Sequence, residues 1–178
     1  MQFGSEDDQA MLENSLDPGF LRLTSGSSTV ATVTSTIPAS TLDIKGGAGN
    51  DVIIIGDIDN VIASRMVVDG QAGNDDLSAA PSRFAVSMTG GAGVDRMSGN
   101  NGNDTLLGGD DDDTLYGGSG SDTLLGEFGS DLVNGQGSND LIAGGHGDGE
   151  AQTGDRLIGP ESEIDENFIF TAAWIEEV

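Results

Sequence analysis

Aspartate recurs at every ninth residue in the middle of the chain, where few basic side chains could pair with it. The six residues are Asp95, Asp104, Asp113, Asp122, Asp131 and Asp140. The 178-residue chain has 31 acidic residues against 6 lysines and arginines, a net charge of -25, and such a charge opposes compaction through self-repulsion. Nucleic acids and anionic membranes would need lysine and arginine clusters that the sequence lacks. The carboxylates therefore predict bound multivalent cations.

These aspartates belong to a nine-residue repeat that runs without gaps from Gly90 to Ala143. Its units are GGAGVDRMS, GNNGNDTLL, GGDDDDTLY, GGSGSDTLL, GEFGSDLVN and GQGSNDLIA. The unit-first glycines are Gly90, Gly99, Gly108, Gly117, Gly126 and Gly135, and the eighth residues are Met97, Leu106, Leu115, Leu124, Val133 and Ile142. A fixed period with aspartate at position six and an apolar residue at position eight predicts a solenoid.

The repeat resembles G-G-x-G-x-D-x-U-x, the haemolysin-type calcium-binding nonapeptide of the RTX (repeats-in-toxin) family. The resemblance implies an all-β fold, a calcium-binding parallel β-roll (right-handed β-helix solenoid). It also implies several Ca2+ ions between turns 18 residues apart, bound by position-six aspartates and by carbonyls of the loops that begin at the unit-first glycines. The expected pairs are Asp95 with Asp113, Asp113 with Asp131, Asp104 with Asp122, and Asp122 with Asp140. Export from bacteria by type I secretion, to the cell surface or beyond, is implied as well.

Less regular copies of the repeat flank this block. GGAGNDVII begins at Gly46 and GQAGNDDLS begins at Gly70, and they add Asp51 and Asp75 to the predicted metal ligands. After Ala143 the unit that begins at Gly144 has no aspartate at position six. An insertion there must bring in Asp148 or Asp155 if that turn is to have a carboxylate.

Two tandem units depart from the family pattern at position four, where glycine is expected. In the last unit glycine and serine exchange places, as Gly137 and Ser138, which puts the carbonyl geometry beside Asp140 in question. In GGDDDDTLY, Asp111 stands where glycine is expected. The sequence leaves open whether Asp111 adds a ligand or distorts its turn.

The physical logic of the repeat defines the elements that position these residues. Glycines allow positive φ, and the last three residues of each unit form a very short strand, so two units make an 18-residue coil with a turn on each side. Turns starting at Gly90, Gly108, Gly126 and Gly144 are expected on one edge, which extends back to Gly70 and Gly46, and those at Gly99, Gly117 and Gly135 on the other. Residues 55–67 and 79–87 interrupt the second edge, so more ions are expected along the first.

The chain divides into three expected parts: residues 1–45, the roll at 46–159, and residues 160–178. Within the first part, residues 5–16 are expected to form a helix with Ser5 as N-cap, whereas residues 24–42, rich in Ser, Thr and Val, favour an extended strand or a linker. Residues 160–178 end in an apolar, acidic cluster that is expected to cap the roll or to resemble a secretion signal.

Catalysis is not expected. The chain has no cysteine and one histidine, His146 in a glycine-rich turn, no G-x-S-x-G or Walker A motif, and no segment outside the repeats long enough for a catalytic domain. Two functions remain open. One is a calcium-dependent extracellular structural protein that folds on binding calcium and assembles into a homo-oligomer, filament or surface layer. The alternative is a C-terminal secretion and folding module of a type I secreted enzyme. No apolar run is long enough to span a membrane.

Overall fold

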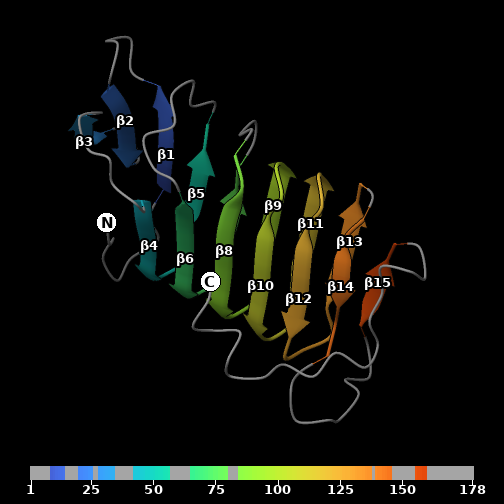
Figure 1. Cartoon of the computed structure of the whole chain (residues 1–178). Helices are drawn as coiled ribbons and strands as arrows, with labels where there is room; N and C mark the ends of the chain where they lie inside the picture. Colours follow the sequence, from blue (N-terminus) through green and yellow to red (C-terminus); the bar gives the residue numbers. More distant parts are fainter. Residues whose placement is uncertain are drawn as a thin grey trace.

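Two β-sheets form the part of the chain that the computed structural model describes, which comprises residues 9–14, 20–25, 28–34, 42–56, 65–79, 84–137, 139–145 and 155–159. The sheets stack into a solenoid, and these residues include no helix (Figure 1). Accordingly, the described chain has no helical segment with the length and hydropathy needed to cross a bilayer.

The chain alternates between the two sheets. The six-stranded sheet contains β4 (Leu42–Ala48), β6 (Met66–Ala72), β8 (Val86–Ala92), β10 (Thr105–Asp110), β12 (Thr123–Glu127) and β14 (Leu141–Ala143). The nine-stranded sheet contains β5 (Val52–Ile55), β7 (Asp76–Ser78), β9 (Arg96–Asn101), β11 (Thr114–Ser119), β13 (Leu132–Gln136) and β15 (Arg156–Ile158), and then β1 (Gln9–Asn14), β2 (Phe20–Ser25) and β3 (Ser28–Thr34). Strands that begin in equivalent places pair in parallel, which confirms the predicted β-roll.

The strand register follows the sequence period. Leu115 pairs with Met97 on one side and with Val133 on the other, each 18 residues away. Before the tandem block the same column continues with a spacing of 20 between Leu77 and Met97. Position-eight residues therefore stack on one another, as the sequence predicts.

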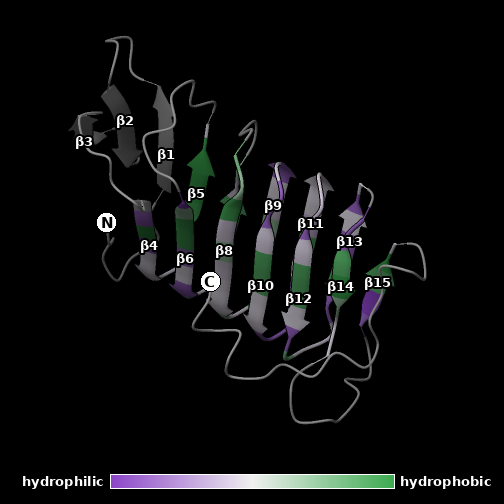
Figure 2. Ribbon diagram, in the orientation of Figure 1, coloured by the Kyte–Doolittle hydropathy of each residue, from purple (hydrophilic) through white to green (hydrophobic). Residues whose placement is uncertain are grey.

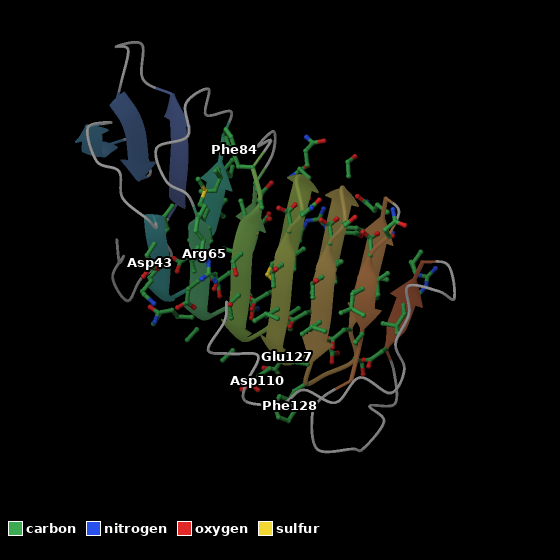
Figure 3. The ribbon with its side chains drawn as sticks, viewed as in Figure 1. Asp43, Arg65, Phe84, Asp110, Glu127 and Phe128 are labelled. Carbon is green, nitrogen blue, oxygen red and sulfur yellow. The ribbon has the colours of Figure 1, made fainter. Side chains whose placement is uncertain are left out.

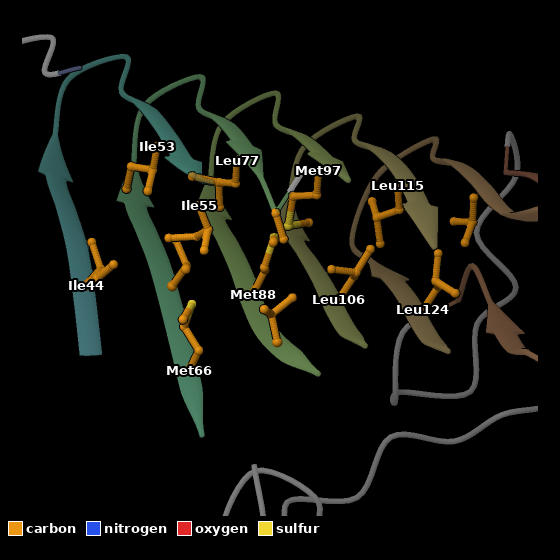
Figure 4. Close-up of a cluster of buried hydrophobic side chains, with 14 of the residues drawn as sticks. Ile44, Ile53, Ile55, Met66, Leu77, Met88, Met97, Leu106, Leu115 and Leu124 are labelled. Carbon is orange, nitrogen blue, oxygen red and sulfur yellow. The ribbon is translucent and has the colours of Figure 1, made fainter. Parts of the chain in front are cut away.

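These stacked residues form the core. Leu77, Leu106, Leu115 and Leu124 are fully buried and belong to one hydrophobic cluster that runs the length of the roll (Figure 4). Colouring by hydropathy shows apolar residues recurring in strand after strand (Figure 2). Because each coil buries few large side chains at about 1.5–3 kcal/mol each, the stability of the roll must depend heavily on its turns.

Most strands of the roll are longer than the three residues expected from the repeat, although β7, β14 and β15 have three. β10 begins at position seven of one unit, passes through the glycine pair of the next, and ends at Asp110. Its Gly109 still pairs with Gly91 and Glu127 although its φ is 123°. The absence of a Cβ lets the glycine adopt this angle while the backbone ladder continues.

The helix expected over residues 5–16 is wrong for the described residues 9–14, which form strand β1. This strand pairs in parallel with β5 and antiparallel with β2. A helix of this length is marginal in isolation, whereas the edge of β5 offers unpaired backbone groups that a strand can satisfy. The extended conformation is therefore the more favourable one for residues 9–14.

The strand option for residues 24–42 is confirmed by β3, which covers residues 28–34 and pairs with β2. Other expectations fall outside the described residues. These are the fate of residues 5–8 and 15–16, the interrupted turns at 57–64 and 80–83, Asp148 and His146, and the cap at 160–178.

Candidate metal centres along the two edges of the roll

The position-six aspartates and Asp155 form two columns on opposite sides of the roll. The long edge contains Asp51, Asp75, Asp95, Asp113, Asp131 and Asp155, in the turns that lead from the six-stranded to the nine-stranded sheet. The short edge contains Asp104, Asp122 and Asp140, in the turns that lead back. Figure 3 shows Phe84 on the side of the short edge and Asp110, Glu127 and Phe128 on the side of the long edge. All of these aspartates except the partly buried Asp155 are at most 5% exposed.

One oxygen of each carboxylate joins neighbouring coils. On the long edge, Oδ1 of Asp113 accepts the backbone N–H of Asp95 at 2.8 Å, and Oδ1 of Asp131 accepts that of Asp113 at 2.9 Å. The same bond links Asp51 to Asp75 and Asp75 to Asp95, at 2.8 and 2.7 Å, despite their longer spacing. The structure thus brings together the predicted pairs Asp95–Asp113 and Asp113–Asp131, and it extends the same pairing to Asp51 and Asp75.

The short edge repeats the arrangement with fewer members. Oδ1 of Asp122 accepts the N–H of Asp104 at 2.9 Å, and Oδ1 of Asp140 accepts that of Asp122 at 3.0 Å. Asp140 therefore keeps its place despite the exchanged glycine and serine before it. At the other end, Oδ1 of Asp104 accepts the N–H of Val86 at 2.9 Å. Since valine has no carboxylate, the column of aspartates begins at Asp104.

The second oxygen of the carboxylates faces the interior. Six Oδ2 atoms are buried with no hydrogen-bond partner among the described residues: those of Asp75, Asp95, Asp104, Asp113, Asp122 and Asp131. A buried acceptor without a partner costs about 1–3 kcal/mol, and more when it is charged. Such an arrangement repeated in two columns needs a positive counterpart.

Burial also makes these carboxylates hard to ionise. Loss of solvent raises the pKa of Asp113 to about 8, and nearby carboxylates add to this effect, while its bond to the Asp95 N–H opposes it. Burial likewise raises the pKa of Asp95 and Asp104 to about 7 and that of Asp131 to about 6. A bound dication would reverse this effect because it stabilises the ionised form.

The unit-first glycines leave the space that these oxygens face. A Cβ placed on Gly108 would meet both Oδ2 of Asp113 and the carbonyl oxygen of Gly126 in the next coil. Equivalent cradles of one carboxylate oxygen and one main-chain carbonyl occur at Gly46, Gly70, Gly90, Gly99 and Gly117. Carboxylates mixed with backbone carbonyls are the donor set that Ca2+ prefers, so the residues present fit this ion.

Side chains alone do not complete such a site. Within the described ranges no three carboxylate, imidazole or thiolate groups converge as a metal site. Main-chain carbonyls and water would therefore provide the remaining ligands. At Gly91, Gly93 and Gly109 a Cβ would strike a carbonyl of the preceding coil, which shows that these carbonyls are directed along the roll.

Asp111 has a positive φ like the glycine that it replaces, but at 75°, against 120° for Gly93 and 138° for Gly129 at the same position. Its side chain is exposed, so it does not join the buried carboxylates. The adjacent bond from the Gly93 N–H to the Asp110 carbonyl is 3.3 Å long, against 2.8 Å for the equivalent bond from Gly73 to Ala92. Asp111 thus loosens its turn slightly and adds no buried ligand.

The last turn of the long edge receives its carboxylate from Asp155. Its Oδ1 accepts the N–H of Asp131 at 2.9 Å, and its Oδ2 lies where a Cβ on Gly144 would be. The sequence left Asp148 and Asp155 as alternatives because the insertion between them obscures the period. In the repeat, the aspartate is followed directly by a short strand, and Asp155 is followed by the strand Arg156–Ile158. This order was the sequence signal that favoured Asp155 over Asp148.

A second ladder of side chains was missed by sequence reasoning. Oδ1 of Asn50 accepts the N–H of Asn74 at 2.8 Å, and Oδ1 of Asn74 accepts the N–H of Val94 at 3.0 Å. Asn103 and Asp112 make the same bond to Ser121 and Ser130. These residues hold position five, where the sequence shows only small or polar residues and one valine.

Comparison with protein families identifies the repeats. The model for the RTX calcium-binding nonapeptide repeat (4 copies) matches residues 43–57, 89–124 and 116–149. These ranges include the tandem block and the copy at Gly46, but not the copy at Gly70. The searches of curated proteins and of solved structures returned no significant match.

Proposed function

We propose that this chain, whose repeats match the RTX calcium-binding nonapeptide, is a non-enzymatic, calcium-dependent structural protein of the cell exterior whose roll folds as ions fill its edges. The observation that carries this proposal is the pair of oxygens at each cradle. At Gly108, for example, Asp113 Oδ2 and the Gly126 carbonyl face one space, and no described residue donates a hydrogen bond to this Oδ2. Calcium supplies the positive charge that these oxygens need.

The ligands assigned to the ions are the position-six aspartates of both edges, with the carbonyls of the glycine-rich loops. On the long edge Asp155 joins the predicted residues, because it occupies the same place in its turn. The long edge has twice as many aspartates as the short edge in the described chain. More ions therefore bind along the long edge.

Folding and binding are coupled in this proposal. Without ions, buried carboxylates on successive coils lack compensation, and the 29 glycines raise the entropy lost on folding. Extracellular calcium modules bind at about 10⁻⁴ to 10⁻³ M, so the chain would stay unfolded where calcium is scarce. This supports export before folding, by type I secretion as in the family.

A calcium titration followed by circular dichroism tests the proposal. We expect a disordered spectrum in chelator and a β spectrum at millimolar calcium, with magnesium much less effective because it demands octahedral geometry at shorter distances. An unchanged spectrum across the titration would contradict the proposal. Equilibrium dialysis on the folded chain then counts the ions.

The proposal also includes self-assembly of the folded chain. The solenoid ends in sheet edges that could pair with another copy. The alternative function, a secretion and folding module of a larger exported enzyme, shares the calcium response but needs no assembly. Sedimentation with and without calcium therefore separates the two.

A further inference from the structure

The two sheets present four terminal strands in the described chain. β3 and β15 end the nine-stranded sheet, and β4 and β14 end the six-stranded sheet. A terminal strand has one row of unpaired backbone groups, and natural proteins usually protect it by shortness, charge or proline. The four strands differ in this protection.

Three of the four carry the usual protection. β14 and β15 have three residues each, and β15 begins with Arg156. β4 includes Asp43 and Lys45. Such strands are poor templates for pairing with another chain.

β3 is neither short nor charged and contains no proline, although its register against β2 shifts between Ala31 and Thr29, which marks a β-bulge or irregularity there. Its seven residues, STVATVT, contain no charge and no proline, and three of them are threonine and two valine, which favour strands. The surrounding segment, residues 23–42, contains no charged residue in a chain of net charge -25. β3 is thus a long, neutral strand at the end of a sheet.

We infer that β3 pairs antiparallel with β3 of a second copy, forming a symmetric dimer. Two acidic molecules repel each other over most of their surfaces, but two β3 segments meet without like charges. A two-fold axis makes the contact self-complementary. In the centred register Ala31 faces Ala31 of the partner.

The dimer rests on the proposed function, because the sheet that ends in β3 is part of the roll. β1 pairs with β5 over Gln9 to Val52 through Leu12 to Ile55, and β2 and β3 continue the same sheet. When calcium folds the roll, it provides the template on which β1, β2 and β3 align. Dimerisation therefore depends on calcium.

Cysteine cross-linking tests the register, since the chain has no cysteine of its own. Facing residues in an antiparallel pair have Cα atoms about 4.5–5.5 Å apart, within the range of a disulfide. In calcium under mild oxidation, Ala31→Cys should run mostly as a covalent dimer on a non-reducing gel. Ser98→Cys, on the outer face of β9, should remain monomeric. Equal cross-linking of the two variants would overturn the inference.

Sedimentation of the full chain tests the interface without covalent capture. The calcium-loaded protein should have twice the chain mass of 18.1 kDa, Ala31→Asp should have the mass of one chain, and Ser98→Asp should remain a dimer. Circular dichroism on the same samples separates the two claims. A calcium-folded wild type with the mass of one chain, or of more than two, overturns the dimer, whereas the absence of a calcium response overturns the proposed function.

Discussion

The carboxylate of Asp113 accepts the backbone N–H of Asp95 through Oδ1 at 2.8 Å, while its Oδ2 is buried and has no hydrogen-bond partner in the described part of the chain. One side chain thus fixes the register of two coils and presents an oxygen to the cradle at Gly108. Because the same residues set the fold and form the candidate site, metal binding and folding cannot be separated along the roll.

Asp113→Asn should weaken the calcium response. Asparagine keeps an acceptor for the Asp95 N–H, but it removes the charge that faces Gly108. We expect the calcium concentration at the folding midpoint to rise about tenfold, which corresponds to about 1.4 kcal/mol, in a titration followed by circular dichroism. The control is Asp112→Asn, an exposed neighbour whose bond to Ser130 an asparagine can also make. Equal midpoints for both variants would refute the role of Asp113.

Gly108→Ala should disrupt the same site by filling it. The new methyl group would meet Asp113 Oδ2 and the Gly126 carbonyl, so either the turn shifts or the ion is displaced. Calcium affinity measured by calorimetry should fall, and fewer ions should bind. Gly145→Ala is the matched control because a Cβ there has nothing within 4 Å. If both variants bind calcium like the wild type, the cradle is not an ion site.

The sequence was sufficient for the roll and for the two columns of aspartates because the period fixes the register. Once Leu115 stacks on Met97, Asp113 must stack on Asp95. The periodic signal also extended to Asp51 and Asp75, where spacing alone was ambiguous.

What the sequence missed depends on contacts between segments rather than on local pattern. Residues 9–14 have a helical pattern, but pairing with β5 decides their conformation. The choice of Asp155 depends on how the insertion folds back to Asp131. The different roles of Oδ1 and Oδ2 are visible only in the three-dimensional structure, because the spacing of aspartates in the sequence does not distinguish their two oxygens.

The roll without metal should be more stable in acid than in base. In the folded chain the pKa of Asp113 is raised to about 8 and those of Asp95 and Asp104 to about 7, against an ordinary value of 3.8. Protons therefore bind the folded state more tightly, and their contribution is complete below pH 3.8 and is lost as the pH rises through about 7 to 8. In chelator at constant ionic strength, β structure should increase from pH 8.5 to pH 5. Asp113→Asn should show a smaller change, and a loss of β structure toward pH 5 would contradict the prediction.

Asp155→Asn should weaken the last site of the long edge. The carboxylate lies beside Gly144 and accepts the N–H of Asp131, so its charge is expected to bind the terminal ion. The folding midpoint should move to higher calcium, by less than for Asp113→Asn because a terminal coil has one neighbour instead of two. Asp148→Asn, at the other aspartate of the insertion, serves as the control. A larger effect for Asp148→Asn would reverse this assignment.

Val94→Asn should stabilise the calcium-loaded roll by restoring a rung of the position-five ladder. Asn74 accepts the N–H of Val94, and Asp112 accepts the N–H of Ser130. Between these two bonds, the side chain of Val94 has no acceptor for the N–H of Asp112. Its side chain is also 52% exposed, so little burial is lost on replacement. One added hydrogen bond contributes about 0.5–1.5 kcal/mol, which should raise the urea midpoint in saturating calcium. Val94→Ala removes the valine without adding an acceptor, and an equal midpoint for the two variants would show that the ladder does not stabilise the fold.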